Sequence, residues 1–126
     1  MKTYLPQKVA RITKIKSGVR FWTHGVDFYN DKRFEEERTG DLYLFPGFEE
    51  IPVVLTKPRG SFAKHNKEGY KVWEPETGLL IFELLSIKNV KHDPMDALEG
   101  AHARLKMMGK AVVLEAIGSH LEKLYL

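Results

Sequence analysis

The stretch from Tyr70 to Leu85 constrains the fold of this chain more than any other. Its first residues alternate between the two faces of a strand, and residues 75–78, which include a proline and a glycine, give a strong turn signal. The return strand is a continuous apolar run from Leu79 to Phe82, which is typical of a strand covered on both faces. We interpret residues 70–85 as a β-hairpin at the centre of a sheet, on which later helices pack.

Two helices are predicted after this hairpin. Asp93 and Pro94 form a helix start, because aspartate caps helices and proline suits the first helical position. Apolar residues then recur at helical spacing until Gly109, which ends or kinks the helix. Gly100 lies inside this helix at a cost of about 1 kcal/mol relative to alanine, and a close approach to the sheet would explain its presence.

The second helix is predicted over residues 111–124 from an apolar stripe that begins at Val113. The alternative is a strand over residues 111–117, because three consecutive residues there are apolar and two of them are β-branched.

The first half of the chain reads mainly as short strands. Residues 8–24 resemble a hairpin that turns at Lys16-Ser17-Gly18. Residues 26–29 could be a short strand, and residues 30–38 could be either one or two helical turns or a loop. Further strands are expected at 41–45 and 51–56, with a turn at Pro46-Gly47 between them. Residues 57–69 and 86–92 read as loops, the latter with room for a short strand at 87–90.

These elements predict one α+β domain over residues 1–126, mainly β over 1–92 and helical over 93–126. We expect an antiparallel sheet of about five or six strands packed by two C-terminal helices. The expected core includes Ile12, Phe21, Leu42, Leu44, Val54, Val72, Leu79, Ile81, Leu98, Leu105, Val113, Ile117 and Leu121.

Several classes of chemistry lack their sequence signatures. The chain has no cysteine, which excludes disulfides, thiolate metal sites and a cysteine nucleophile, and which fits the cytoplasm. The five histidines show no metal-ligand spacing, and no nucleophile elbow, phosphate-binding loop or dinucleotide fingerprint is present. No apolar run approaches the length of a membrane span, and the start lacks the apolar stretch of a signal peptide. We expect no metal, no cofactor and no membrane association, and a binding protein rather than an enzyme.

The net charge of +3 conceals alternating blocks of opposite sign. Residues 1–26 carry six lysines and arginines and no acid, whereas residues 27–50 carry eight acids against three bases. Residues 51–73 carry five bases against one acid, and residues 74–100 carry six acids against two bases. Such blocks often face each other in the folded protein or form separate faces for a charged partner.

The basic block at 57–71 is the first candidate binding surface. It combines cations with aromatic side chains, which is what binding of single-stranded nucleic acid or nucleotides requires. A solvated loop beside a lysine-protected edge strand would have the same composition. The candidate residues are Lys57, Arg59, Phe62, Lys64, His65, Lys67, Tyr70 and Lys71.

An acidic segment is the second candidate surface. It could bind a basic partner or imitate a phosphate backbone, although a run of acids is often just a solvated face. The candidate residues are Asp27, Asp31, Glu35, Glu36 and Glu37.

In the C-terminal part, the strand Thr77-Gly78-Leu79-Leu80-Ile81 precedes a helix that carries Asp96-Ala97-Leu98 and Ala103-Arg104-Leu105 before Gly109. This order resembles that of a group of small accessory proteins of bacteriophages and mobile elements. In those proteins a "TGL-I" strand leads to an "EAI…A…RL…G" helix. This chain has a longer connection and Asp96 in place of the usual glutamate. The resemblance carries over no catalytic residue, and it implies a small protein that binds a macromolecule of the host or the phage.

Three functions remain open at this stage. The leading hypothesis is a non-enzymatic binding protein that acts through protein–protein contacts, for example as an inhibitor of a host system. The first alternative is nucleic-acid or nucleotide binding through residues 57–71. The second is a small enzyme on a phosphorylated substrate, which would need His65 or His24 beside a carboxylate in a deep pocket. The apolar end at Leu121, Leu124, Tyr125 and Leu126 could complete the core of a monomer or form a homodimer contact.

Overall fold

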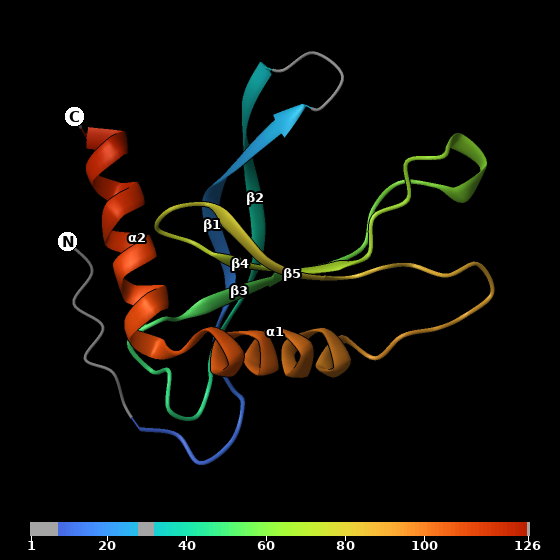
Figure 1. Ribbon diagram of the computed structural model, residues 1–126. Helices are drawn as coiled ribbons and strands as arrows, with labels where there is room; N and C mark the ends of the chain where they lie inside the picture. Colours follow the sequence, from blue (N-terminus) through green and yellow to red (C-terminus); the bar gives the residue numbers. More distant parts are fainter. Residues whose placement is uncertain (1–7, 28–31, 126) are drawn as a thin grey trace.

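The computed structural model is an α+β domain in which a five-stranded antiparallel sheet is followed by two helices (Figure 1). It describes residues 8–27 and 32–125; for residues 25–27, 32–34 and 121–125 the backbone alone is described. The predicted fold class is therefore confirmed. The strands are β1 (Thr13–Asp27), β2 (Lys32–Leu44), β3 (Val53–Thr56), β4 (Tyr70–Glu74) and β5 (Leu79–Leu84).

The sheet is a meander, since its strands lie in the order β1-β2-β3-β4-β5 and each pairs with the next one in sequence. β1 and β2 are much longer than the others and form a ribbon that rises out of the sheet (Figure 1). A short 3-10 helix, η1 (Phe62–Lys64), lies in the connection between β3 and β4.

The predicted hairpin over residues 8–24 is wrong. Thr13 to Asp27 is one strand that pairs with β2 along its length, from Thr13 opposite Leu44 to Asp27 opposite Lys32. Gly18, with a φ of 68°, does not turn the chain; it lies where the register shifts between Lys16 and Val19. A positive φ suits a β-bulge as well as a tight turn, so the glycine signal alone could not distinguish the two.

The helical turns considered for residues 30–38 are also wrong over the described part, because β2 begins at Lys32. The strand considered at residues 26–29 is confirmed only as the end of β1, and residues 28–31 lie outside the described part. No strand forms at 87–90 either. There Asn89 has a positive φ and the amide of Val90 donates to the carbonyl of Ile87, which makes a turn.

The hairpin at residues 70–85 is confirmed as β4 and β5, but its predicted position at the centre of the sheet is wrong. β5 is the last strand, and the side chain of Leu80 is 44% exposed. The continuous apolar run has a different origin. A register shift between Val72 and Trp73 leaves Ile81 as an extra residue in β5, so Ile81 and Phe82 both reach the helix side of the sheet.

The sheet curls so that the turn between β4 and β5 meets β1. The amide of His24 in β1 donates to the carbonyl of Gly78 at 2.9 Å. Gly78 has a φ of 72°, and a Cβ there would overlap the carbonyl oxygen of Trp22. Glycine is therefore required here both by its backbone conformation and by this close approach.

The first helix packs against β4 and β5 on one face of the sheet, whereas the second stands beside the β4–β5 turn and reaches the core through Val113 and Ile117 (Figure 1). They are α1 (Pro94–Met108) and α2 (Lys110–Tyr125), so the strand alternative for residues 111–117 is wrong. The side chain of Asp93 caps α1 by accepting from the amide of Met95 at 2.8 Å, as predicted. The close approach expected at Gly100 is present, since a Cβ there would overlap the ring of Phe82 in β5.

Two groups of buried side chains lie on opposite faces of the sheet. The larger group, under the helices, includes Phe45, Val72, Leu98 and Leu105. The smaller group lies on the other face and consists of Phe21, Leu42, Val54 and Trp73. Of the expected core residues, Ile12, Leu79, Ile81 and Ile117 are half-buried, the side chain of Leu121 is not described, and the others are buried.

Candidate functional site

Five charged side chains fix the base of the connection between β3 and β4. We call this group the arm-base cluster; it consists of Glu36, Arg38, Arg59, Glu68 and Lys71. Arg59 forks onto both carboxylate oxygens of Glu36, and its Nε also donates to Glu68 Oε2 at 3.0 Å. Arg38 donates to the other oxygen of Glu68 at 3.0 Å, and Lys71 Nζ lies 3.7 Å from that oxygen. Cations and anions from β2, the connection and β4 thus form one network of ion pairs.

Trp73 supports this cluster from the sheet. The guanidinium of Arg38 lies 5.5 Å from the centre of the Trp73 ring, and the ammonium of Lys71 lies 5.4 Å from it. The indole Nε1 donates to Thr56 Oγ1 at 2.9 Å, which fixes the ring. Cations placed over an indole are attracted by its π system. Arg38 and Lys71 are therefore each held by two interactions, one with the Trp73 ring and one with the carboxylate of Glu68.

The cluster also shifts the ionisation of its members. The hydrogen bonds and charge of Arg59 hold the pKa of the Glu36 carboxyl below its usual value. Burial raises the pKa of Glu68, but the hydrogen bond from Arg59 and the charges of Lys71 and Arg38 outweigh it, so that pKa is lowered too. The two glutamates raise the pKa of Arg59 in turn. Glu36, Glu68 and Arg59 are therefore ionised at neutral pH.

Beyond its base, the connection forms an arm, residues 57–69, with an ordered tip. The hydroxyl of Ser61 accepts from the amide of Ala63, and the side-chain oxygen of Asn66 accepts from the amide of Ser61 at 2.9 Å. The amide of Glu68 donates to the carbonyl of Arg59 at 2.7 Å, which joins the two sides of the arm. Its own hydrogen bonds therefore define the shape of this first arm.

A second arm, residues 85–92, projects from the same end of the molecule, away from α2 (Figure 1). The hydroxyl of Ser86 donates to the carbonyl of Glu68 at 2.8 Å and joins the bases of the two arms. The amide of Gly69 donates to the carboxylate of Glu83 at 3.0 Å beside this contact.

Between the arms lies a groove of about 450 Å³, which we call the two-arm groove. Its lining combines cations, aromatic rings and aliphatic side chains. The lining residues are Pro58, Phe62, Lys67, Tyr70, Ser86, Ile87, Asn89, Val90, Lys91 and His92. No carboxylate lines it, so the groove suits an anionic ligand with apolar groups.

The structure divides the predicted basic surface of residues 57–71 into three parts. Phe62, Lys67 and Tyr70 line the two-arm groove. Arg59 and Lys71 belong to the arm-base cluster, where carboxylates occupy them. The others are exposed but lie outside the groove: Lys57, Lys64 and His65.

The acidic candidates whose side chains are described face basic side chains of the same chain. Glu36 belongs to the arm-base cluster. Glu35 lies 3.5 Å from His24 Nδ1, and Glu37 lies 4.0 Å from Arg20, both across the β1–β2 ribbon. Asp31 lies outside the described residues, and Asp27 is described by its backbone alone. Binding through this acidic surface stays a prediction, and the contacts show instead that opposite blocks pair within the fold.

A second hollow lies on the other side of the base of the first arm. It has a volume of about 400 Å³ and is lined by Gly18 of β1, by residues 38–41 of β2, by Leu55 of β3 and by Lys57, Pro58 and Arg59 of the first arm. None of the described lysines or arginines at the start of the chain lines it. Pro58 also lines the two-arm groove, so both hollows adjoin the base of this arm.

The histidines named for the enzyme hypothesis lie at the surface of the molecule or near it. His65 is exposed at the tip of the first arm, and His24 is half-buried beside Glu35. Within the described part of the chain, no three histidine or acidic side chains gather as metal ligands would. No helix that the structure describes combines the length and the hydropathy of a membrane span.

Comparisons with protein-family models, with curated proteins and with solved structures found no match to this chain.

Sequence reasoning missed the contribution of the second arm to the groove. Ser86, Ile87, Lys91 and His92 line it from a segment that we interpreted as a plain loop. One signal was present, because Lys88 and Lys91 are the only bases among residues 74–100. Their position opposite the first arm depends on the β4–β5 pairing, in which Tyr70 faces Leu84.

Proposed function

We propose that this chain is a binding protein without enzymatic activity, and that its two-arm groove holds an acidic segment of another protein that also carries apolar side chains. One observation carries the proposal. Four large hydrophobic side chains are exposed on the two arms: Phe62 by 39%, Leu85 by 68%, Ile87 by 56% and Val90 by 51%. Apolar side chains exposed together are typical of protein interaction sites.

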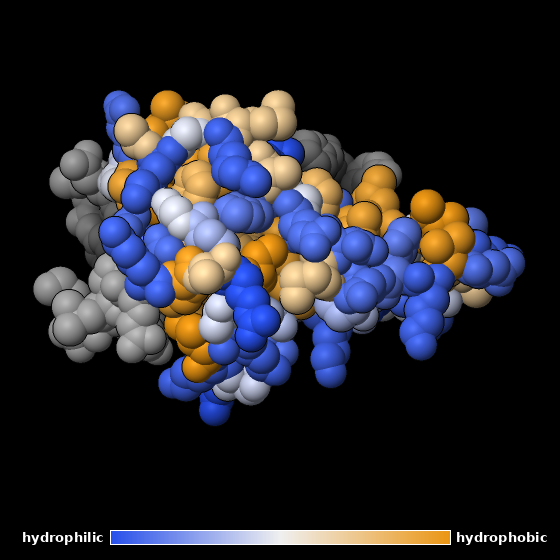
Figure 2. All heavy atoms as spheres, turned by 90° about the horizontal axis from the view of Figure 1, so that it is seen from below, coloured by the Kyte–Doolittle hydropathy of each residue, from blue (hydrophilic) through white to orange (hydrophobic). Residues whose placement is uncertain are grey.

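The charge of the arms supports an acidic partner. Lys67 and Lys91 line the groove, and Lys64 and Lys88 are exposed on the same arms. The one acid of the first arm, Glu68, is already bound by the arm-base cluster. In Figure 2, hydrophobic residues lie among hydrophilic ones at the end of the molecule where the arms project. Complementary charge would accelerate and orient binding, while the apolar contacts would supply most of the affinity.

The resemblance to accessory proteins of phages and mobile elements supports a partner from a host or phage system, met in the cytoplasm. This origin is part of the proposal. It rests on the residues of the strand and helix between Thr77 and Gly109.

A peptide-binding experiment tests the groove. The probe is a fluorescein-labelled peptide of alternating glutamate and leucine, measured by anisotropy beside a polyglutamate peptide of equal charge. We expect the leucine-containing peptide to bind more tightly. Replacing both Ile87 and Val90 by serine should weaken it about tenfold or more, because each lost apolar contact removes on the order of 1 kcal/mol.

Met107→Ser is the matched control, since Met107 is an exposed apolar residue on α1 outside the groove. Equal affinity of the two peptides, or equal weakening by the control, would contradict the proposed function.

A second candidate, binding of single-stranded nucleic acid, is favoured by Phe62 and Tyr70, whose rings lie in the groove beside Lys67. If an oligothymidine probe binds more tightly than the acidic peptide, this function replaces the first. Its affinity should then fall steeply with salt. Replacing Lys64, Lys67 and Lys91 together by alanine should reduce that salt dependence, whereas the two serine substitutions should leave it unchanged.

A further inference from the structure

The two edges of the sheet are protected to very different degrees. β1 carries Lys14, Lys16 and Arg20 in its first half, and its pairing register with β2 shifts twice between Lys14 and Val19. Lysines, arginines and bulges are the usual means by which proteins prevent another strand from pairing with an edge. β5 has the sequence LLIFEL and carries a single charge, that of Glu83. The edge at β5 therefore lacks the charged protection that the edge at β1 has.

The backbone of β5 is paired on one side. β4 bonds to it from Tyr70 opposite Leu84 to Glu74 opposite Leu79. β1 also comes close to β5 itself, but its hydrogen bond to this hairpin is made just before the strand, at Gly78, whose carbonyl accepts from His24. In the described part of the chain, β4 is the only strand paired with β5. Unpaired amides and carbonyls at such an edge form a template for an additional strand.

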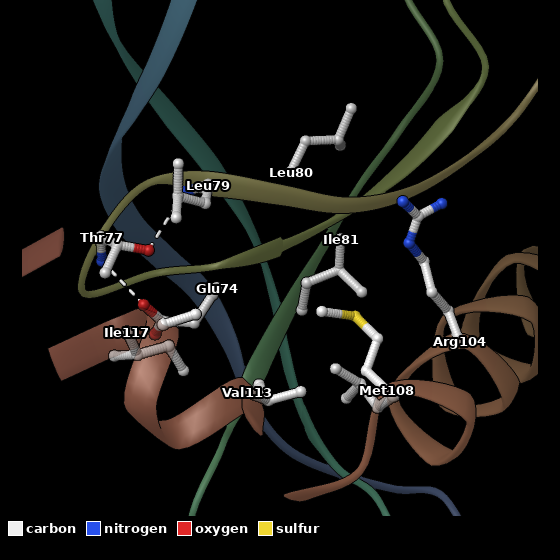
Figure 3. A pocket seen from close by; sticks show the side chains of 11 residues that line it. Glu74, Thr77, Leu79, Leu80, Ile81, Arg104, Met108, Val113 and Ile117 are labelled. Atoms are coloured by element: carbon white, nitrogen blue, oxygen red, sulfur yellow. Dashed lines mark hydrogen bonds between the residues drawn. The ribbon is translucent and has the colours of Figure 1, made fainter. Parts of the chain in front are cut away.

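An apolar pocket of about 150 Å³ lies directly beside this edge. Figure 3 shows Ile81 of β5, Met108 of α1, and Val113 and Ile117 of α2 around it. We call it the β5 pocket. An apolar cavity of roughly this volume accepts a benzene-sized group, so one large aliphatic or aromatic side chain would fit.

Arg104 supplies a charge at the rim of this pocket. It lies on α1, and Figure 3 shows its guanidinium extending toward β5. Its side chain is exposed, and no described carboxylate lies within ion-pair distance of it. The other charged residue of the lining, Glu74, is buried and accepts from the amides of Glu76 and Thr77, so it is already satisfied.

We propose that an extended peptide segment of a partner adds as a strand to β5, inserts one large apolar side chain into the β5 pocket, and places a carboxylate against Arg104. Each part of the occupant is specified by a different feature. The backbone edge selects an extended chain, the pocket selects an apolar side chain, and the guanidinium selects an acid or a terminal carboxylate. The site is separate from the two-arm groove and does not depend on the proposed function.

A second copy of the chain fits this site less well. Its own β5 would bring Glu83 as the sole charge, and that carboxylate already accepts from the amide of Gly69. Pairing two β5 strands would also bring the Arg104 side chains of both copies to one interface, where their like charges repel.

Selection of random linear peptides by display on the whole chain tests the proposal. The enriched sequences should alternate β-forming residues and share a large apolar residue near an acid. The tightest peptide, made synthetically, should slow hydrogen exchange of amides between Leu80 and Leu84, because strand addition satisfies the free edge.

Two substitutions separate this site from the rest of the surface. Ala116→Trp fills the β5 pocket and should weaken the selected peptide about tenfold or more, and Arg104→Ala should have a similar effect. The matched control for Arg104 is Lys106→Ala, which removes one exposed cation of α1 outside the pocket. Replacing Ile87 and Val90 by serine should leave this affinity unchanged.

Three results would overturn the proposal: no enrichment, enriched peptides that bind both variants as tightly as the original chain, or binding without protection of β5. A fourth result that would overturn it could come from sedimentation of the chain alone. A dimer that dissociates on Leu80→Asp substitution would assign this edge to a second copy.

Discussion

The first arm shows two different uses of charge within a few residues. At its base, Arg59 and Glu68 are bound within the arm-base cluster, and the side chain of Arg38 beside them is only 7% exposed. Toward its tip, Lys64 and Lys67 are exposed and have no carboxylate within ion-pair distance in the described part of the chain. The base thus uses charge to fix the position of the arm, whereas the charges of the outer part are exposed to solvent.

This difference shows that a block of like charges in a sequence does not define a binding surface. The cations at 57–71 look equivalent in the sequence. In the structure, Arg59 and Lys71 form ion pairs with the carboxylates of Glu36 and Glu68, and these pairs fix the base of the arm. Substitutions at the base should therefore change stability, whereas substitutions near the tip should change binding.

The largest expected effect is that of Glu68→Gln. It leaves the nearly buried Arg38 without its carboxylate, and we expect the free energy of unfolding to fall by about 2 kcal/mol, measured by urea denaturation. Glu76→Gln is the control, because Glu76 is exposed and belongs to no ion pair among the described residues. A loss below about 0.5 kcal/mol would show that the cluster does not stabilise the fold.

Acid should reveal the same cluster with a smaller effect. The folded-state pKa values of Glu36 and Glu68 lie below the ordinary value of 4.5, so the stability they contribute is complete above that pH. It is lost as the pH falls through the lowered folded-state values. Urea denaturation at several pH values should show a decline below about pH 5 that is shallower in a variant with both residues changed to glutamine. If the free energy of unfolding declined equally with pH in the original chain and in the variant, the acid sensitivity would not come from Glu36 and Glu68.

The smallest effect is expected for Arg59→Lys. The lysine keeps the charge but loses the fork that binds both oxygens of Glu36, and the site is half exposed, so the loss should be about 1 kcal/mol or less. High salt should reduce the difference from the original chain. Lys67→Ala, near the tip, should change the free energy of unfolding by less than about 0.5 kcal/mol. Equal losses for both substitutions would remove the distinction between base and tip.

The parts of the fold that the sequence predicted well depend on local signals. Asp93 caps α1, Gly109 separates the two helices, and Gly78 closes the β4–β5 turn. The errors arose where one local signal fits two structures. Gly18 could serve a turn or a bulge, and the polar residues before Arg38 form a strand because they pair with β1.

The candidate site was predicted in part, for a similar reason. Phe62, Lys67 and Tyr70 were expected in a binding surface, and they line the groove. The neutralisation of Arg59 could not be predicted, because Glu36 is distant in the sequence and meets it only when β2 and the first arm are in place. The β5 pocket likewise requires β5, α1 and α2 to converge.

The fit between Gly100 and the ring of Phe82 sets how α1 lies on the sheet, and this has a consequence for the distance between the two proposed sites. α1 has 15 residues and is therefore about 22 Å long. His92, just before its start, lines the two-arm groove, and Met108, at its end, lines the β5 pocket. A single partner with two motifs joined by a linker of matching reach would bind bivalently. Its second motif would then act at an effective concentration in the millimolar range, so two weak contacts could together give tight and selective binding.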